Sequence, residues 1–166
     1  AARRSGTTFA AEVADSANKT RLMPFEFSTA QTYMLEFSNL KIRVYKDSST
    51  VFEGNKVITG ITKANPAVVT SNGHGYTNGN EIKIRSVVGM TEVNEKRFLV
   101  ANVTTNTFSL TDKDGTNINS TAFTAYTSGG IVNRVFEITT PYTTAQLFDI
   151  KFAQSADVMY LCHPAH

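Results

Sequence analysis

Short runs of alternating apolar and polar residues cover most of the chain, and turns rich in Gly, Asn, Ser and Thr separate them. Alternation with a period of two is typical of strands with one buried face. The strongest hairpin is predicted over residues 31–46, where a turn at Ser38-Asn39 joins two alternating runs. Its alternating apolar positions are Tyr33, Leu35, Phe37, Ile42 and Val44. The pattern therefore favours an all-β protein.

The segment from Ile58 to Val132 has the pattern of a complete small β module. A strand over residues 67–71 leads into Asn72-Gly73 and Asn78-Gly79, and alternation resumes over residues 81–85 with Ile82 and Ile84 on one face. Asn-Gly steps accept positive φ at low cost, so the chain can reverse tightly there. Further short strands follow without any helical stripe. We predict a β-barrel-like module over residues 58–132.

The flanking segments, residues 1–57 and 133–166, show weaker strand patterns. Candidate strands cover residues 9–15, 21–28, 151–154 and 157–163. Thr143 and Gln146 have the spacing of a capping box, which predicts a helical turn over residues 144–149. The sequence Ser-Thr-Ala-Gln at residue 28 is echoed by Thr-Thr-Ala-Gln at residue 143. We therefore predict a discontinuous β domain that the module interrupts.

The aromatic residues of the two flanks are expected to form one core, and Leu22 joins the inward set. The residues expected from the first flank are Phe25, Phe27, Tyr33, Leu35 and Phe37, and those from the second are Phe136, Ile138, Phe148 and Phe152.

Composition bounds the class of protein. The chain has 166 residues, 41% hydrophobic and 18% charged, which suits a globular protein with a sizeable core. A formal net charge of +2 is too small to imply a nucleic-acid or membrane partner by itself. The single cysteine excludes an internal disulfide framework. The chain does not begin with Met, so we expect a segment of a longer polypeptide.

Two clusters contain residue types that bind metals. Cys162, His163 and His166 supply three ligands where a structural zinc site needs four, and His74 is distant in sequence. The run from Asp112 to Asn117 begins like a calcium loop, but it lacks the third acidic position and the closing Glu. We expect a buried strand-end cysteine at the first cluster and a hairpin turn at the second, with no metal or cofactor at either.

No arrangement of residues indicates catalysis, so no catalytic residue is assigned. There is no Gly-x-Ser-x-Gly elbow, and His74 between two glycines is expected to be a turn residue. Glu92 and Glu95 are expected to be exposed charges beside Lys96 and Arg97. The basic residues are expected at surface positions, interleaved with Tyr45 and Tyr76. They are Arg3, Arg4, Lys41, Arg43, Lys83 and Arg85.

Residues 64–112 and 125–132 carry a family resemblance that spans roughly Ile58 to Val132 and is most specific at Gly89-Met-Thr-Glu-Val-Asn94 and Val100-Ala-Asn-Val103. The segment resembles the β-barrel module related to the first catalytic cysteine half-domain of ubiquitin-activating enzymes, in the form inserted into tailed-phage virion proteins. Cys162 lies outside the module. The resemblance therefore implies a fold and a virion context, and no enzymatic residue.

The flanks carry a second resemblance, over residues 19–47 and 138–166. They are similar to the N-terminal region of large tail proteins of short-tailed phages, of the kind that build the nozzle or distal tail tube. This implies a structural virion protein, assembled in the host cytoplasm, that forms a ring or tube for genome delivery. Its partners would be copies of itself, other tail proteins and the host envelope, with no sequence-specific nucleic acid, and its module would lie outside the tube.

Two other classes of function are alternatives to the hypothesis of a structural virion protein. A receptor- or carbohydrate-binding β module of a tail or fibre protein would show a groove of exposed aromatic residues, and this chain has no Trp. An enzyme would need a catalytic arrangement, and none is recognisable. The sequence therefore favours a structural role.

Overall fold

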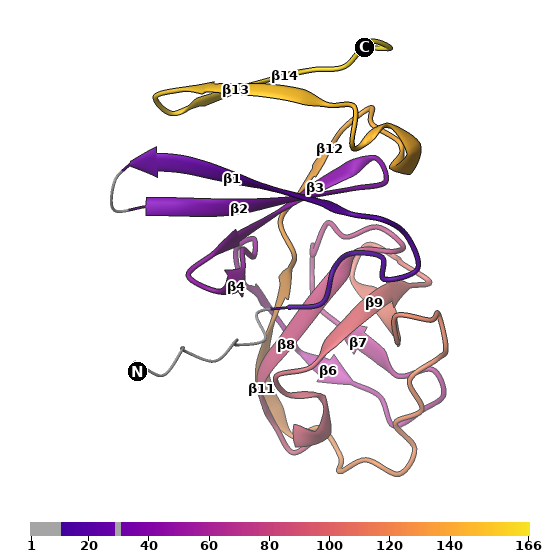
Figure 1. Cartoon of the computed structure of the whole chain (residues 1–166). Helices are drawn as coiled ribbons and strands as arrows, with labels where there is room; N and C mark the ends of the chain where they lie inside the picture. Colours follow the sequence, from indigo (N-terminus) through magenta and orange to yellow (C-terminus); the bar gives the residue numbers. More distant parts are fainter. Residues whose placement is uncertain (1–10, 29–30) are drawn as a thin grey trace, which may run out of the picture. The chain divides into compact units, whose positions relative to one another are not determined.

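The computed structural model describes residues 11–28 and 31–166, and these are all-β, as predicted (Figure 1). Fourteen strands and two short 3-10 helices make up the regular structure of this part of the chain. Two compact units are present. Unit 1 joins the described residues up to Val51 with Phe136–His166, and unit 2 comprises Phe52–Val135. Unit 2 is wider than the module of residues 58–132 that the sequence predicts.

Unit 1 is built on an antiparallel sheet with the strand order β1-β2-β3-β12, and β4 pairs with the far end of β3. The strands are β1 (Arg21–Ser28), β2 (Gln31–Ser38), β3 (Lys41–Lys46), β4 (Ser49–Thr50) and β12 (Glu137–Thr139). The predicted hairpin of residues 31–46 is thus present as β2 and β3. Its turn lies one residue later than expected, because Leu40 adopts the left-handed conformation with φ of 60°.

The core of unit 1 uses one face of this sheet. Phe37 and Ile42 stand opposite each other in the β2–β3 register. Met23 on β1 stands opposite Leu35 on β2. Segments after β12 cover this face. The buried residues are Met23, Phe37, Ile42, Tyr142, Leu147 and Ile150, with Leu35 and Leu161 packed against them. The core therefore joins two segments that are about a hundred residues apart, as predicted.

The residues that the second flank contributes to this core differ from those expected. Leu147 and Ile150 are three residues apart at a helical turn, so they share one side and Phe148 points away. Ile138 lies on the short edge strand β12, and Phe152 lies on a hairpin with little cover. Met23 is buried in place of its neighbour Leu22. The exposed members of the predicted set are Leu22, Phe136, Ile138, Phe148 and Phe152. The side chain of Phe27 lies outside the described part of the structure.

The predicted strand at residues 9–15 is wrong over residues 11–15, which carry no strand, and residues 9 and 10 lie outside the described part. The reason is visible at Ala14. Its backbone N–H donates to Oε1 of Glu36 at 2.7 Å, so a side chain takes the place of a ladder partner.

The C-terminal part of unit 1 follows the prediction closely. The 3-10 helix η2 (Thr144–Gln146) begins with the predicted capping box, in which the N–H of Thr143 donates to Oε1 of Gln146 at 2.9 Å. The strands β13 (Lys151–Ser155) and β14 (Val158–Cys162) then form a two-stranded sheet. Nη1 of Arg21 donates to the carbonyl oxygens of Leu147 and Ile150 at 2.9 and 2.8 Å. These two hydrogen bonds hold the C-terminal segment against β1.

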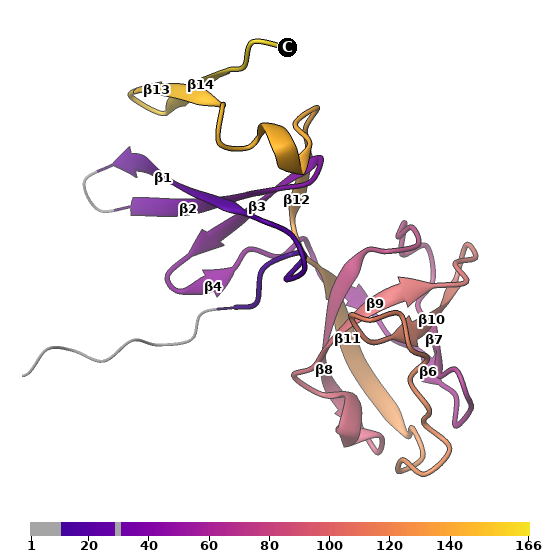
Figure 2. The same ribbon diagram turned by 45° about the vertical axis from the view of Figure 1, so that its right-hand side comes forward.

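Unit 2 is a strongly curled, half-barrel sheet of seven strands in the order β5-β11-β8-β9-β10-β7-β6 (Figure 2). The 3-10 helix η1 (Thr91–Val93) follows β8. The strands are β5 (Lys56–Val57), β6 (Gly60–Ile61), β7 (Val68–Thr70), β8 (Glu81–Val88), β9 (Arg97–Ala101), β10 (Thr107–Thr111) and β11 (Ser128–Arg134). The barrel-like β fold predicted for this segment is confirmed.

The concave side of this sheet holds the core of unit 2. Ile82 and Ile84 are fully buried, as their alternation predicts, and Phe108 and Leu110 join them from β10. The two ends of the unit lie side by side, because Phe52 and Val135 form an antiparallel bridge. Glu53 and Arg134 reinforce this pairing through an ion pair of 2.7 Å.

Candidate functional site

The face of the unit 1 sheet opposite its core carries a buried carboxylate. Glu36 on β2 is 0% exposed. Its Oε1 accepts the Ala14 N–H at 2.7 Å, and its Oε2 accepts the hydroxyl hydrogen of Tyr45 on β3. An ionised carboxylate is costly to bury, and two neutral donors offset only part of this cost. Sequence reasoning did not find Glu36, because alternation with Leu35 and Phe37 indicates a solvent-facing polar residue.

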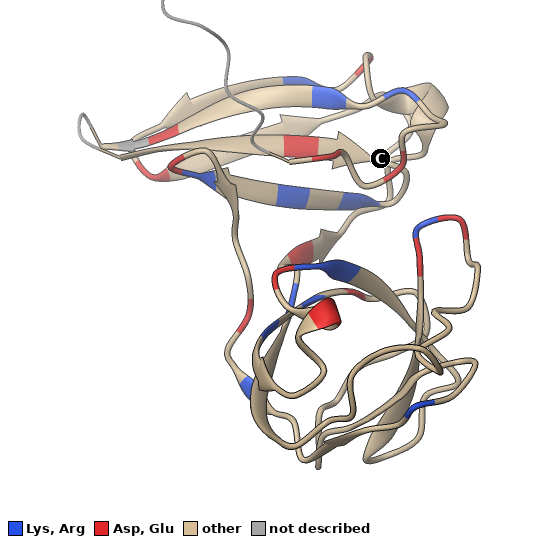
Figure 3. Ribbon diagram, turned by 90° about the horizontal axis from the view of Figure 1, so that it is seen from below, with Lys and Arg blue, Asp and Glu red and all other residues tan. Residues whose placement is uncertain are grey.

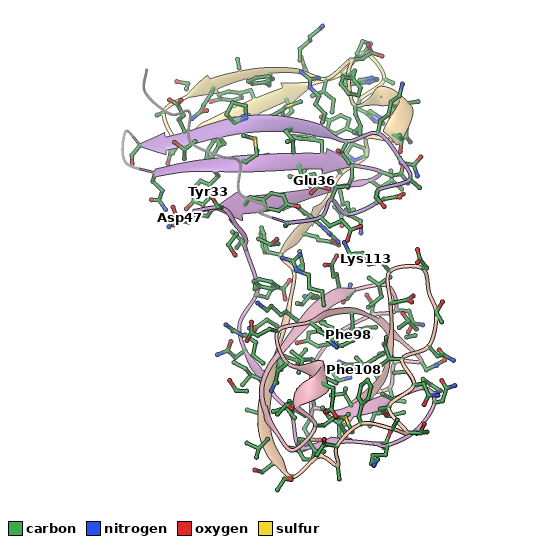
Figure 4. The ribbon with its side chains drawn as sticks, turned by 60° about the horizontal axis from the view of Figure 1, so that its bottom comes forward. Tyr33, Glu36, Asp47, Phe98, Phe108 and Lys113 are labelled. Carbon is green, nitrogen blue, oxygen red and sulfur yellow. The ribbon has the colours of Figure 1, made fainter. Side chains whose placement is uncertain are left out.

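A cavity of about 330 Å³ opens on this face of the sheet beside Glu36. Tyr33 and Asp47 lie close together, and Glu36 lies farther along the sheet (Figure 4). The lining combines apolar side chains with carboxylates and hydroxyls. Its residues are Ala11, Val13, Leu22, Thr32, Tyr33, Met34, Glu36, Tyr45, Asp47 and Ser48. This cavity is the candidate binding site of unit 1.

Arg43 stands opposite Glu36 in the β2–β3 register, but its charge is directed elsewhere. Its Nε donates to Oε1 of Glu137 on β12 at 2.7 Å, and Lys41 pairs with the other oxygen of that carboxylate at 3.1 Å. Arg43 is 2% exposed, so its predicted surface position is wrong. The burial follows from the cross-strand pairing of β3 with β12. Arg3 and Arg4 lie outside the described part of the chain.

The C-terminal Cys-His cluster is an aromatic contact in the structure. The rings of His163 and His166 lie 6.1 and 5.5 Å from that of Tyr142. Cys162 is exposed, so its predicted burial is wrong, because residues alternate along β14 and it falls on the outer face. Among the described residues, no three His, Cys, Asp or Glu side chains are grouped closely enough to hold a metal ion.

The run after β10 forms a turn. Oδ1 of Asp112 accepts the N–H groups of Asp114 and Thr116 at 3.0 and 2.8 Å, and Gly115 has a φ of 83°. The carboxylate of Asp112 therefore stabilises the turn itself. Thr111 and Asn117 close it with an antiparallel bridge. This is the hairpin turn expected from the sequence.

The two glutamates near η1 have separate partners. Glu92 accepts hydrogen bonds from the backbone N–H and the hydroxyl of Thr124 at 2.7 and 3.0 Å, and the backbone bond in particular lowers the pKa of Glu92. Glu95 pairs with Lys83 at 2.6 Å. Glu92 is half-buried, contrary to the expectation of a fully exposed charge. Both carboxylates therefore stabilise loops of unit 2, Glu92 through hydrogen bonds and Glu95 through an ion pair.

His74 is a turn residue, as expected, but its ring is buried in an aromatic cluster. The ring centroid lies 5.0 Å from that of Tyr76 and 5.1 Å from that of Phe108. Its Nδ1 accepts the backbone N–H of Tyr76 at 3.0 Å, which fixes the turn after Gly75. The histidine therefore shapes the loop that leads into β8.

A second buried charge lies at the start of β8. Glu81 is 1% exposed, and Nη1 of Arg97 lies 3.2 Å from its Oε1. Nζ of Lys113 approaches the other carboxylate oxygen at 3.9 Å. The guanidinium of Arg97 also lies over the ring of Phe52 at 5.4 Å. These contacts make Glu81 a structural ion-pair centre of unit 2, which the strand alternation did not reveal.

Tyr76 gives unit 2 a dependence on alkaline pH. Burial raises the pKa of Tyr76 to about 12 from its ordinary 10.0, with Arg134 opposing the rise and Glu53 adding to it. The folded state thus holds this proton more tightly than the unfolded chain. The contribution to stability is complete below pH 10 and is lost as the pH rises toward 12. We expect unit 2 to lose roughly 2–3 kcal/mol of unfolding free energy from Tyr76 across this range.

Urea unfolding at several alkaline pH values, followed through the methyl resonance of Met90 in the unit 2 core, measures this loss. Tyr76→Phe is the control, because it keeps the ring and removes the titrating hydroxyl. The variant should show a smaller fall in stability between pH 10 and pH 12. An equal fall in both proteins would contradict the assignment to Tyr76.

Charged residues of both signs are interspersed in each unit (Figure 3). Within the described ranges, no helix has the length and apolar character that would let it cross a membrane.

Comparison with known proteins identifies part of unit 2. Residues 64–135 match the family model of the ubiquitin-activating enzyme E1 FCCH domain, so an E1 FCCH-like domain is present. The match confirms the resemblance to the FCCH domain, whereas the phage-virion form of the module stays a prediction, and the match covers less than half of the 166-residue chain. No curated protein matches the chain. The similarity of the flanks to phage tail proteins stays a prediction.

Proposed function

We propose that this chain is a structural component of a phage tail that assembles with copies of itself through unit 1, forming part of a nozzle-like ring or tube. The observation that carries the proposal is the C-terminal hairpin of β13 and β14. It exposes apolar side chains and unpaired strand edges. The resemblance of the flanks to tail proteins supplies the context.

The hairpin has little support from the rest of unit 1. Every residue of β13 is exposed, and on β14 only Met159 and Leu161 are partly covered. Val158 and Tyr160 are 45% and 62% exposed, and they share the outer face of the hairpin because residues alternate along a strand. A two-stranded hairpin alone is marginally stable in water. Contact with another subunit would stabilise it.

The edge strand β1, in contrast, is protected against strand addition. The side-chain amide of Gln154 donates to the carbonyl of Glu26 and accepts its N–H, so these backbone groups point away from β2. Pro24 is two residues earlier and points the same way, but it has no N–H to donate. Proline and side-chain covers are ways in which proteins block an edge. Assembly is therefore better served by the hairpin.

A ring suits such a contact. Each subunit of a closed ring uses the same pair of surfaces, so a contact of modest strength is repeated around the axis. The repeated contacts then act together to hold the ring. Other tail proteins would then contact the two open ends of this ring. We propose no catalytic role for any residue of the chain.

The oligomeric state tests the proposal. We expect the purified protein to form oligomers by sedimentation velocity, and Tyr160→Lys to shift them strongly toward monomer, since the lysine charge would have to be buried in the contact. Val88→Lys is the matched control, because Val88 is 54% exposed on unit 2. It should leave the oligomers intact.

Two outcomes would count against the proposal. A wild-type protein that stays monomeric at high concentration would exclude assembly through its own copies. Oligomers that Tyr160→Lys and Val88→Lys weaken equally would place the contact outside the hairpin. Symmetry-related copies around the tail axis of a particle, with the hairpin in contact, would be the expected arrangement in an image of the assembly.

A further inference from the structure

We infer that the cavity beside Glu36 binds an alkylammonium group, a primary ammonium carried on a short apolar chain. This inference is independent of the assembly of unit 1. It rests on a buried carboxylate that forms no ion pair with a lysine or arginine of the described residues, on an apolar cavity next to it, and on a lining that contains carboxylates and hydroxyls.

The charge of Glu36 is the first part of the argument. Its side chain is 0% exposed, and its partners are the Ala14 N–H and the Tyr45 hydroxyl, both of them neutral donors. Within residues 11–28 and 31–166, no lysine or arginine forms an ion pair with this carboxylate. Each carboxylate oxygen can accept more than one hydrogen bond. Glu36 therefore retains acceptor capacity for a cation, and a cation from the cavity would reach this fully buried carboxylate by displacing the Tyr45 hydroxyl or the chain at Ala14.

The cavity supplies the rest of the chemistry. Its volume of about 330 Å³ falls in the range of small-molecule sites. Val13, Leu22 and Met34 give apolar walls that suit a hydrocarbon chain, and the described residues of the lining include no lysine or arginine. Asp47 adds a second carboxylate, farther along the sheet from Glu36 (Figure 4). An anion would be repelled here, and a neutral alcohol would leave the charge of Glu36 unpaired.

The methionines of the chain provide the reporter. Met34 lines the cavity, whereas Met23 lies in the core on the other face of the sheet and Met90 lies in unit 2. In protein with labelled methionine methyl groups, titration with hexylammonium should shift the Met34 resonance saturably and leave those of Met23 and Met90 in place. Hexanol and hexanoate match the chain length and should shift Met34 at least about tenfold more weakly.

Two substitutions test the role of the carboxylate. Glu36→Gln keeps the shape and removes the charge, and it should weaken hexylammonium binding at least about tenfold. Leu22 stands opposite Glu36 in the β1–β2 register and is half exposed, so Leu22→Lys supplies an internal ammonium that should block binding even if Glu36→Gln fails to fold. Glu26→Gln, which removes an exposed carboxylate on the same sheet, is the control and should bind normally.

The source of the ammonium is resolved in the same experiment. Stronger binding of an N-acetyl lysine methylamide than of hexylammonium would identify the ligand as a lysine side chain of another protein, and the reverse would identify a free amine. A Met34 resonance that does not move, or that moves equally with hexanol, would overturn the inference. So would undiminished binding by both Glu36→Gln and Leu22→Lys.

Discussion

Phe37→Ala should lower the free energy of unfolding of unit 1 by about 3–5 kcal/mol, the usual loss for a buried aromatic side chain. Phe37 is 0% exposed and packs in the cluster that joins β1, β2 and β3 to the C-terminal segment. Removal of the Phe37 ring would leave a cavity between the β1–β3 strands and the C-terminal segment, whose apolar side chains pack together in this core. Urea unfolding followed through the Met23 methyl resonance measures the loss, and the Met90 resonance of unit 2 should keep its midpoint.

Phe152→Ala is the matched control on the other flank. Phe152 is 44% exposed on β13, so we expect a loss of less than about 1 kcal/mol. This differs from the expectation based on the sequence, in which both phenylalanines belong to one core. Small losses at both positions would show that the cluster around Phe37 is not the core of unit 1, and large losses at both would show that Phe152 also belongs to the core.

The local structure of this chain could be predicted because it depends on near neighbours. The hairpin of β2 and β3, the capping box at Thr143, and the burial of Ile82 and Ile84 each follow from spacings within a few residues. The FCCH-like domain was recognisable because its residues are nearly contiguous. In these cases the sequence pattern and the final packing agree.

The choice of face could not be predicted in the same way. Leu22 and Met23 are adjacent apolar residues on β1, and strict alternation from Phe25 places Met23 rather than Leu22 on the face of Phe25. Met23 is buried because it stands opposite Leu35, on the face that the segment after β12 covers. That choice depends on a contact across more than a hundred residues. The selection of Leu147 and Ile150 over Phe148 likewise required the helical turn to be known.

The candidate site was hidden for a related reason. Glu36, Arg43 and Glu81 occupy the polar phase of their strands, where a solvent-facing side chain is the ordinary expectation. Each is buried because another segment covers it. The Ala14 N–H donates to Glu36, Arg43 donates to Glu137 on β12, and Arg97 forms an ion pair with Glu81. When a sheet is covered on both faces, polar–apolar alternation no longer tells which side chains are buried.

Gly89→Ala should destabilise unit 2 by at least about 3 kcal/mol, because strain and steric overlap act together. Gly89 has a φ of 93°, which an L side chain rarely adopts. A Cβ atom there would lie 2.2 Å from the carbonyl oxygen of Ala125 and 2.8 Å from the nitrogen of Thr127. The neighbouring backbone cannot yield cheaply, since the Thr127 N–H donates to the carbonyl of Val88 at 2.9 Å.

Gly115→Ala separates strain from overlap in the Gly89 prediction. Gly115 has a similar φ of 83°, but a Cβ atom there would meet nothing within 4 Å. It should therefore cost only about 1–2 kcal/mol, the penalty for an L residue in a left-handed conformation. Both losses can be measured by urea unfolding through the Met90 methyl resonance. If the two alanine variants lose the same stability, the close approach of residues 125–127 to Gly89 does not constrain the fold, and backbone conformation alone explains the need for glycine.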